Sequence, residues 1–288
     1  MELNFLATIL LSSLSSASIL LIATLGLAVV YGLMGVINLA HGEFIMVGAY
    51  SALTATQIGL PFLLAIPFAV VTTMTIGAVV EFLIIRKLYG RLFDTMLATW
   101  GLGMVFNQVA VLVFGTVSPG IGMPQWSFKI GDYSLAVYPT LMIFVAAVIL
   151  VFIYLLMTHT VYGMKARASI QQPQMAQAIG IDSSRVNTMT FAIGSGLAGL
   201  AGAILLPIIP ATPSMGLFFA VKGFLTVVVA GPVTLTGSAL AALGLGGGAS
   251  VTASFMTSVV GDVFFFLVTA ILLWLYPMGI SAKWRRKL

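Results

Sequence analysis

Apolar segments of twenty or more residues recur from one end of the chain to the other, and they limit the fold more than any other feature. Only 7% of the 288 residues are charged, against about 25% in soluble domains. With 60% hydrophobic residues and a mean hydropathy of +1.16, such a chain cannot cover a globule with polar surface, so its solvent must be largely lipid. The alternating ten-residue segments typical of a β-barrel do not occur. We therefore predict an all-α, polytopic transmembrane helical bundle that forms one domain over residues 1–288.

Several kinds of site are excluded by what the sequence lacks. Cysteine is absent, which excludes disulfides, thiolate metal sites and a cysteine nucleophile. No GxxxxGK[ST] segment is present, so the chain cannot bind ATP through a P-loop. The formal charge of +5 does not indicate nucleic acid, because the Lys and Arg residues lie mostly at segment ends, where they orient helices. We expect no cofactor and no metal. The N-terminus has no basic region before its apolar run, so we expect it to belong to the mature protein.

Three basic clusters assign the cytoplasmic side of the membrane. They are RKLYGR at 86–91, the group Lys165, Arg167 and Arg185, and KWRRK at 283–287. Two apolar spans separate the first cluster from the second, so the loop 116–133 between those spans should lie outside. Counted in this way, the chain has eight or nine membrane segments, depending on whether residues 4–14 form a segment of their own.

Two of the predicted segments are too short to cross a bilayer. The segment 217–231 would be about 22 Å long as a helix, against ~30 Å for the hydrocarbon core, and Pro232 would end it. A short helix at 44–58 follows a polar interruption in the first third. Glycine-bearing turns at 38–44 and 230–239 thus form a pair of breaks in the two halves of the chain. This pattern is typical of inverted-repeat transporters, and we predict a bundle with some short or broken helices and an inverted repeat.

The first break, NLAHGEF, places Asn38, His41 and Glu43 in an otherwise apolar sequence. Charged groups at the bilayer centre cost roughly 2.5–3.5 kcal/mol on insertion scales, so they normally face protein or water. We predict that Asn38 caps the following helix and shares a face with His41, and that Glu43 lies near the positive helix end. Gly42 would let the backbone bend or pack closely. Two interpretations remain open: a cytoplasmic turn with satisfied polar groups, or the lining or gate of a permeation path.

The longest predicted cytoplasmic loop covers residues 163–186. It contains a short amphipathic helix around 174–179, and the trio Asp182, Ser183 and Ser184 offers side-chain oxygens to the start of the next span. Met175, Ala178 and Ile179 form an apolar patch on one face of the short helix, which is more than a solvated loop needs. The patch indicates a docking surface. The other interpretation is a loop kept inside by its positive charges alone.

The remaining polar residues have simpler expected roles. Glu81 is expected to meet the membrane interface. Lys222 and Asp262 could form a pair, but snorkelling to the external interface is the simpler expectation. Asn107 and Gln108 fall within one span, where they would either hold helices together, which is the default expectation, or line a pore. The small residues of 191–205 are expected to let helices pack closely.

Four stretches resemble, in the same order, the permease subunits of bacterial branched-chain amino-acid ABC importers, a family that includes importers of urea and short-chain amides. YGLMGVINLAHGEFIMVGAY is similar to the first signature of that family. GMKARASIQQPQMAQAIGIDSSRVNTMTFAIGSGLAGLAG resembles its coupling loop and the helix that follows. AVKGFLTVVVAG and GDVFFFLVTAILLWLYPMGI resemble its next and last helices. The resemblance covers most of the chain, and YGRLFDTMLATWGL is nearest to the urea-type branch.

The resemblance implies a multi-pass, non-enzymatic permease subunit of an ATP-driven importer in the bacterial inner membrane. The implied partners are a second related permease, two cytoplasmic ATPase subunits and an external solute-binding protein. The loop helix would dock in a groove of an ATPase, with Gly180 ending it. The segment SIQQP lacks the acidic residue that is common in the family, which would change an electrostatic contact with the ATPase. The residues assigned to this contact are Met175, Ala176, Ala178, Ile179 and Gly180.

Mostly uncharged, small residues line the candidate breaks, so a small neutral or zwitterionic solute fits best. The order of preference is a branched-chain or other hydrophobic amino acid, then urea or a short-chain amide. Asn38, His41, Gly42 and Glu43 are the candidates for the translocation path or gate. The alternative is a self-contained channel or proton-coupled secondary transporter, in which His41 and Glu43 would relay protons.

Overall fold

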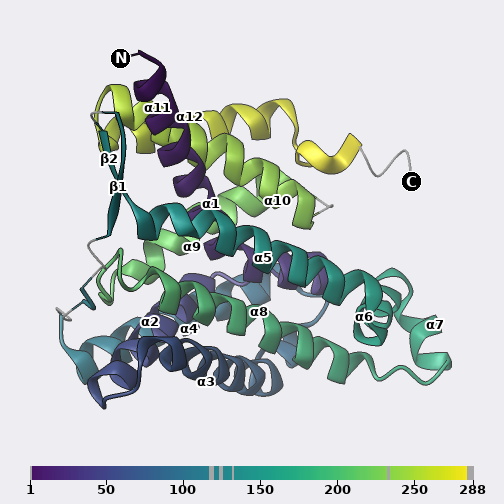
Figure 1. The fold of residues 1–288 in the computed structure, drawn as a ribbon. Helices are drawn as coiled ribbons and strands as arrows, with labels where there is room; N and C mark the ends of the chain where they lie inside the picture. The colour runs from purple at the N-terminus through teal and green to yellow at the C-terminus, as the bar shows by residue number, and fades with distance from the viewer. Residues whose placement is uncertain (1, 117–119, 123–125, 132, 232–233, 284–288) are drawn as a thin grey trace.

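The computed structural model describes the chain except for residues 1, 117–119, 123–125, 132, 232–233 and 284–288. The described part is a bundle of helices with one antiparallel hairpin, in which Ser127 lies opposite Ala136 (Figure 1). Pro232 and most of the C-terminal basic cluster, to which the sequence assigned a helix end and a cytoplasmic position, lie outside the described residues. In chain order the elements are α1 (Glu2–Met34), α2 (His41–Gln57), α3 (Phe62–Leu83), η1 (Ile85–Leu88), α4 (Leu92–Phe114), β1 (Ser127–Ile130), β2 (Tyr133–Ala136), α5 (Val137–His159), α6 (Val161–Gln171), α7 (Pro173–Ala178), α8 (Ser183–Leu205), α9 (Met215–Ala230), α10 (Thr234–Ala242), η2 (Leu243–Gly247), α11 (Gly248–Phe255), α12 (Ser258–Leu275) and η3 (Ile280–Lys283).

The helices confirm the predicted all-α polytopic architecture. Within the described residues, seven helical stretches are long and apolar enough to cross a membrane: α1, α3, α4, α5, α8, the stretch from α10 to α11, and α12. The helices α2 and α9 are shorter, with 17 and 16 residues. Together these make nine membrane segments, in agreement with the predicted eight or nine. The N-terminal residues form no separate segment, because they belong to the 33-residue helix α1.

The two regions predicted to face opposite sides of the membrane lie at opposite ends of the bundle. The hairpin β1–β2 extends from one end, and α6 and α7 extend from the other (Figure 1). The ring of Phe5, near the start of α1, packs against Tyr133 of the hairpin and against Phe255 at the end of α11. The starts of α1 and α12 therefore lie at the hairpin end.

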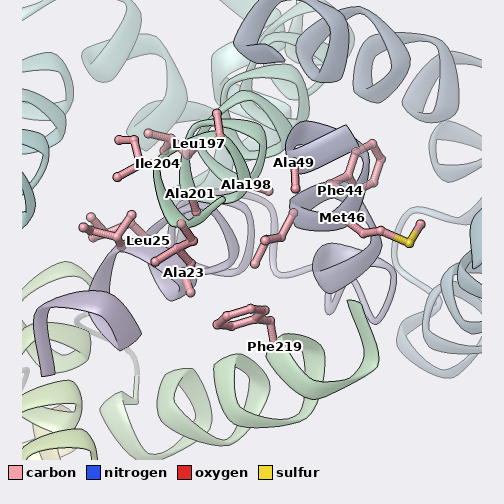
Figure 2. Packing of buried hydrophobic residues seen from close by; sticks show 14 of the residues in the cluster. Ala23, Leu25, Phe44, Met46, Ala49, Leu197, Ala198, Ala201, Ile204 and Phe219 are labelled. Carbon is pink, nitrogen blue, oxygen red and sulfur yellow. The ribbon is translucent and has the colours of Figure 1, made fainter. Parts of the chain in front are cut away.

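The most enclosed helices are α1, α2, α8 and α9. Figure 2 shows apolar side chains from these four helices meeting, among them Leu25, Phe44, Ala198 and Phe219. The outer helices α3, α4, α5 and α12 instead expose large apolar side chains, such as Leu112 and Trp274. An apolar outer surface of this extent suits a lipid solvent.

Glycines bring α2 into direct backbone contact with its neighbours. A Cβ on Gly42 would overlap the carbonyl oxygen of Gly216 in α9, and one on Gly202 would overlap that of Ile45. Likewise, a Cβ on Gly48 would overlap the backbone of Gly199 in α8. The expected packing role of the small residues in 191–205 is therefore confirmed.

The helix α2 begins in the middle of the bundle. It runs alongside α4, with Phe44 packed edge-on against Phe106 and Tyr50 stacked on Phe114 at 4.3 Å between ring centroids. A Cβ on Gly103, the middle residue of α4, would lie 3.5 Å from the Cγ of Glu43. The polar break thus lies at mid-bundle and not at its edge, and α2 extends from there to the hairpin end.

The helix α9 also begins at mid-bundle, but it runs to the opposite end. Its start meets α2 at the contact of Gly216 with Gly42, and its end at Gly231 packs against Gly279, beyond α12. In the second half of the chain, the counterpart of the break at 35–40 is therefore the segment 206–214 before α9, and not the predicted turn at 230–239. Two short helices that leave the middle in opposite directions fit an inverted repeat.

Candidate functional site

Side chains satisfy the backbone amides of the break that precedes α2. The amide of Leu39 donates to Oγ1 of Thr99 in α4 at 3.1 Å, and the amide of Ala40 donates to Oδ1 of Asn38 at 3.1 Å. The N-cap of α2 is Ala40, and the helix begins at His41. The predictions that Asn38 is the N-cap and that the helix begins at residue 44 are therefore wrong. Asn38 instead supports the turn one step earlier, where lipid could not bond the amides.

His41 is buried in the core of the bundle. Its Nε2 lies 2.9 Å from the carbonyl oxygen of Ala23 in α1. A carbonyl can only accept, so Nε2 carries the hydrogen. The ring is 1% exposed and lies against Gly26, where a Cβ would be 2.8 Å from its Cε1. Asn38 lies outside the helix, so the predicted face shared by these two residues does not form.

Glu43 is buried next to glycines of two other helices. It lies in the first turn of α2, as predicted, where the positive helix end favours a carboxylate. It is 6% exposed, and a Cβ on Gly216 would overlap its carboxylate. Among the described residues, its Oε2 has no hydrogen-bond partner. An acceptor left without a donor inside a bundle is costly, so this oxygen is suited to receive an N–H or O–H group from outside the chain.

A cavity of about 390 Å³ lies beside Glu43, between α2, α4 and α9. Its polar lining comes from Glu43, Trp100, Asn107 and Gln108. The Nδ2 of Asn107 donates to the carbonyl of Pro213 at 2.7 Å and so ties α4 to the segment before α9, as expected for an interhelical contact. Gln108 is exposed. Of the four predicted path residues, only Glu43 is part of this lining; the other three shape and hold the break.

The predicted cytoplasmic loop is largely helical. It begins with α6, an 11-residue helix whose N-cap is Thr160, and this helix was not predicted. The short helix α7 follows, as expected. The side chain of Asp182 accepts from the amide of Arg185 at 3.1 Å and caps α8, which confirms its predicted role.

Gly180 ends α7, as predicted. Its φ is +86°, a conformation that favours glycine. Its amide donates to the carbonyl of Gln177 at 3.0 Å, and the amide of Ile181 donates to that of Ala176 at 2.9 Å. These two bonds make a Schellman motif, which satisfies the last carbonyls of the helix.

The exposed face of α7 carries two large apolar side chains. Met175 is 64% exposed and Ile179 is 75% exposed, and both line a groove of about 490 Å³ between α6 and α7. Ala178 is also exposed. Ala176 is only 2% exposed and lines the same groove.

The sequence did not predict a buried charged network at the same end of the bundle. Glu81 is fully buried near the end of α3, and not at the interface as expected. Its carboxylate pairs with Arg86 at 3.3 Å, accepts from Thr188 of α8 at 2.6 Å, and accepts from the hydroxyl of Tyr89. Arg86 also donates to Thr188 at 2.7 Å. The network joins α3 and the turn after it to the first part of α8.

Tyr89 is well suited to donate in this network. Burial, together with the hydrogen bond to Glu81, raises the pKa of its hydroxyl far above the ordinary range. Tyr89 therefore keeps its proton at any physiological pH and acts as a hydrogen-bond donor to the carboxylate. In the sequence, the only signal was an acidic residue five positions before an arginine.

Lys222 and Asp262 form an ion pair between α9 and α12. The Nζ of Lys222 lies 2.7 Å from Oδ1 of Asp262, and Lys222 is only 17% exposed. The expectation of snorkelling is therefore wrong. The sequence allows this pair, but its members are forty residues apart and no local pattern favours it over snorkelling.

Comparison with known proteins agrees with this architecture. Residues 9–275 match the family model described as branched-chain amino acid transport system / permease component. The chain is 26% identical to the probable branched-chain amino acid transport permease protein LivH of Methanocaldococcus jannaschii, over 94% of this chain and 91% of that protein. It is 29% identical to the high-affinity branched-chain amino acid transport system permease protein BraD of Pseudomonas aeruginosa, over 95% of each.

A third relative is the high-affinity branched-chain amino acid transport system permease protein LivH of Escherichia coli, which is 25% identical over 90% of each chain. All three relatives match nearly end to end. The family match covers far more than half of the sequence, including the break, the cavity and α7. The chain therefore belongs to the family of permease components of branched-chain amino-acid transport systems, as a LivH-like, multi-pass transport subunit of an ABC importer in the inner membrane.

Proposed function

We propose that this permease translocates a small hydrophobic amino acid through the cavity beside Glu43, driven by ATP hydrolysis in partner subunits. The observation that carries the proposal is the carboxylate of Glu43, which is buried at mid-bundle and has one oxygen without a donor among the described residues. It lies on the wall of a cavity of about 390 Å³. Intramembrane carboxylates in such positions usually belong to solute or ion pathways.

The chemistry of the site favours an amino acid over urea. The α-ammonium group of an amino acid would supply the missing donor and also cancel the charge of Glu43, whereas urea would supply N–H groups without charge. Compensation of charge counts for more than a neutral hydrogen bond in a medium of low dielectric. Leu39, Met104 and Leu217 line the same cavity and offer contacts to an aliphatic side chain. Branched-chain amino acids therefore rank first, and urea or a short-chain amide second.

A second, related permease would complete the wall of this cavity. Trp100 is 45% exposed and Met104 is 60% exposed on the side of α4 that borders it, next to the exposed amide of Gln108. A polar amide near the middle of a lipid-facing helix is unfavourable, so this face suits contact with protein. A path between two permeases would then have the carboxylate of Glu43 on one wall.

The opposite end of the bundle and the family support the remaining proposed partners, which are two ATPase subunits and a solute-binding protein. Exposed Met175 and Ile179 beside a groove suit docking into a cytoplasmic ATPase, since large exposed apolar groups on a short helix mark interaction sites. Each of two permeases would dock one ATPase subunit. An external solute-binding protein would deliver the solute at the hairpin end.

The geometry gives no support to a proton relay of His41 and Glu43. Residues two apart on a helix lie on nearly opposite faces. His41 is directed to the carbonyl of Ala23 in α1, whereas Glu43 lies against α4 and α9. A relay would need the two groups to share a hydrogen-bonded path.

Uptake measurements test the proposal. Cells that carry or lack the gene are given labelled leucine or labelled urea at micromolar concentrations. We expect leucine uptake to depend on the gene, to require ATP, and to be reduced by excess unlabelled isoleucine. Gene-dependent uptake of urea alone would overturn the amino-acid assignment. Uptake that is driven by a proton gradient without ATP would overturn the importer assignment.

A further inference from the structure

A second cavity, of about 270 Å³, lies between α1, α9, α11 and α12. Its lining has no residue in common with the cavity beside Glu43. Two opposite charges, Lys222 and Asp262, line it from facing helices, and much of the rest of the wall is apolar. Four of the apolar lining residues are Ile19, Leu20, Phe219 and Phe265.

The two charges are held in a defined position. Lys222 lies in the middle of α9, with its Nζ 2.7 Å from Oδ1 of Asp262. The same Nζ is 4.3 Å from the ring centre of Phe218 and 5.5 Å from that of Phe265, so aromatic faces also stabilise it. The side chain of Lys222 is 17% exposed and that of Asp262 is 47% exposed, and a partly exposed ion pair of this kind contributes little to stability. In a membrane span such a pair therefore points to a binding role.

We propose that this cavity is a second binding site for a zwitterionic amino acid. The α-carboxylate of the solute would lie next to Lys222, its α-ammonium next to Asp262, and its aliphatic side chain against Ile19, Leu20 and Phe265. This inference rests on the proposed function, because it takes the same class of solute, and it adds the two charges that would select a zwitterion. The permease would thus distinguish a complete amino acid from a molecule that carries only one of the two charges.

The dimensions and charges of the cavity suit such a ligand. A volume of about 270 Å³ lies just below the range of about 300–1,000 Å³ that is typical of pockets for drug-sized ligands, so it suits a smaller ligand such as an aliphatic amino acid. The ammonium of Lys222 has three donors and the carboxylate of Asp262 has two acceptor oxygens, so both can bond a ligand while they remain paired. The dipole of the ion pair and that of a zwitterion attract each other when antiparallel. An amine or an acid alone would leave one charge without its counterpart.

The competing explanation is that the ion pair only holds α12 against α9. That explanation predicts that removing the pair weakens the bundle, and that no solute protects the cavity. The natural absence of cysteine allows the two explanations to be separated, because a single introduced thiol reports on this cavity alone. Ser250 lines the cavity and is close in size to cysteine. Ser254, one turn further along, is exposed and is not among the lining residues.

The experiment measures the rate at which a small methanethiosulfonate reagent modifies Ser250→Cys in the assembled transporter without its binding protein. Leucine, 4-methylpentanoate and 3-methylbutylamine are compared at millimolar concentrations. These probes share a branched chain. Leucine carries both charges, 4-methylpentanoate only the negative charge and 3-methylbutylamine only the positive charge. We expect leucine to slow modification at least three-fold, and each singly charged probe to have no effect. Ser254→Cys, the control, should react at one rate under all conditions.

The isosteric double variant Lys222→Met/Asp262→Asn tests the two charges directly. We expect it to assemble with the ATPase and to lose protection by leucine. Modification of Ser250→Cys that leucine leaves unchanged, or protection that persists in the double variant, would overturn the inference. If the double variant does not assemble, the two singly charged probes provide the test in Ser250→Cys with Lys222 and Asp262 unchanged. Protection by either probe equal to that by leucine would exclude selection of a zwitterion.

Leucine uptake by the complete importer is measured in parallel and separates this inference from the proposed function. Uptake of leucine without protection of Ser250→Cys would refute the second site and leave the proposed function intact. Absence of leucine uptake would refute the amino-acid assignment of the permease, and the protection result would then still decide whether this cavity binds a zwitterion.

Discussion

Glu43 and His41 lie two residues apart in the first turn of α2, yet they contact different helices. The carboxylate of Glu43 borders the cavity, whereas the ring of His41 bonds to α1. We expect Glu43→Gln to reduce leucine uptake at least several-fold, because an amide of the same size cannot balance an ammonium charge. Expression and ATPase co-purification should persist. Uptake at the wild-type rate would show that this stretch is only a well-satisfied turn.

The neighbouring histidine provides a contrasting prediction. His41→Asn removes the only titratable group of the break besides Glu43 but keeps a side-chain donor for the carbonyl of Ala23. An ATP-driven permease does not need that titratable group. We therefore expect uptake, measured per assembled transporter, to stay within about two-fold of wild type at every pH at which the wild type transports. A variant that assembles but does not transport would return His41 to the path.

Tyr89 allows the contribution of the buried network to be measured. Tyr89→Phe keeps the ring but removes the donor to Glu81, and a hydrogen bond to a charged group contributes about 1.5–3 kcal/mol. We expect a lower midpoint of thermal unfolding for the purified permease complex. Tyr154→Phe, on the exposed surface of α5, serves as the control and should leave the midpoint unchanged. Equal midpoints for both variants would contradict the assigned role of Tyr89.

For single residues, the sequence indicated where polar groups cluster but not which groups they form hydrogen bonds with. NLAHGEF stands out because it is polar within an apolar run. Its partners, Thr99 and the carbonyl of Ala23, lie in segments that carry no signal of their own. The prediction that Glu81 meets the membrane interface was wrong for the same reason, because its partner Thr188 is 107 residues away in the sequence. Side-chain bonds between distant helices depend on packing that local patterns do not contain.

Among the elements, the contact of α2 with α9 depends on glycine. Gly42→Ala would place a methyl group in the carbonyl of Gly216, and overpacking of this kind costs about 1–3 kcal/mol. We expect a lower thermal unfolding midpoint and reduced assembly. Gly101→Ala, in α4, is the matched control: a Cβ there meets nothing within 4 Å, and alanine favours a helix. Similar midpoints for the two variants would refute the close contact.

The end of α7 gives a second prediction about an element. Gly180→Asp introduces backbone strain at a φ of +86° and a charge beside the exposed apolar face. We expect the permease to insert normally but to lose ATPase co-purification and uptake. Gly59→Asp is the control, because Gly59 has a φ of +93° and equally open surroundings at the hairpin end. Normal uptake by Gly180→Asp, or equal losses in both variants, would contradict docking at α7.

For the whole molecule, the orientation in the membrane can be tested with single cysteines. An impermeant thiol reagent added to intact spheroplasts should label Gly122→Cys, near the hairpin, and spare Ile179→Cys in the groove of α7. The reason is that basic loops remain in the cytoplasm. After permeabilisation both positions should react. Labelling of position 179 alone in intact spheroplasts would show that the charge rule has failed for this protein.

The architecture of the whole molecule followed from the sequence more fully than the site did. Long apolar runs and basic clusters were enough for the number of segments, because both reflect the thickness and polarity of the bilayer. The sequence places the second break after α9, whereas the structure has it before α9. Gly231 and Pro232 are conspicuous in the sequence, whereas the segment 206–214 resembles an ordinary loop. The contacts of Gly216 with Gly42 and Glu43 show that both short helices begin at the same depth.

The bond between Leu39 and Thr99 has a consequence for how the protein is made. Thr99 follows Leu39 by 60 residues, so the break leaves the ribosome well before its partner has been synthesised. A backbone amide without a partner in hydrocarbon costs several kcal/mol. We therefore expect the nascent break to remain hydrated during translation, inside the insertion channel or at the bilayer surface. On this argument, the helix α2 would reach its final depth only after α4 has followed it into the membrane.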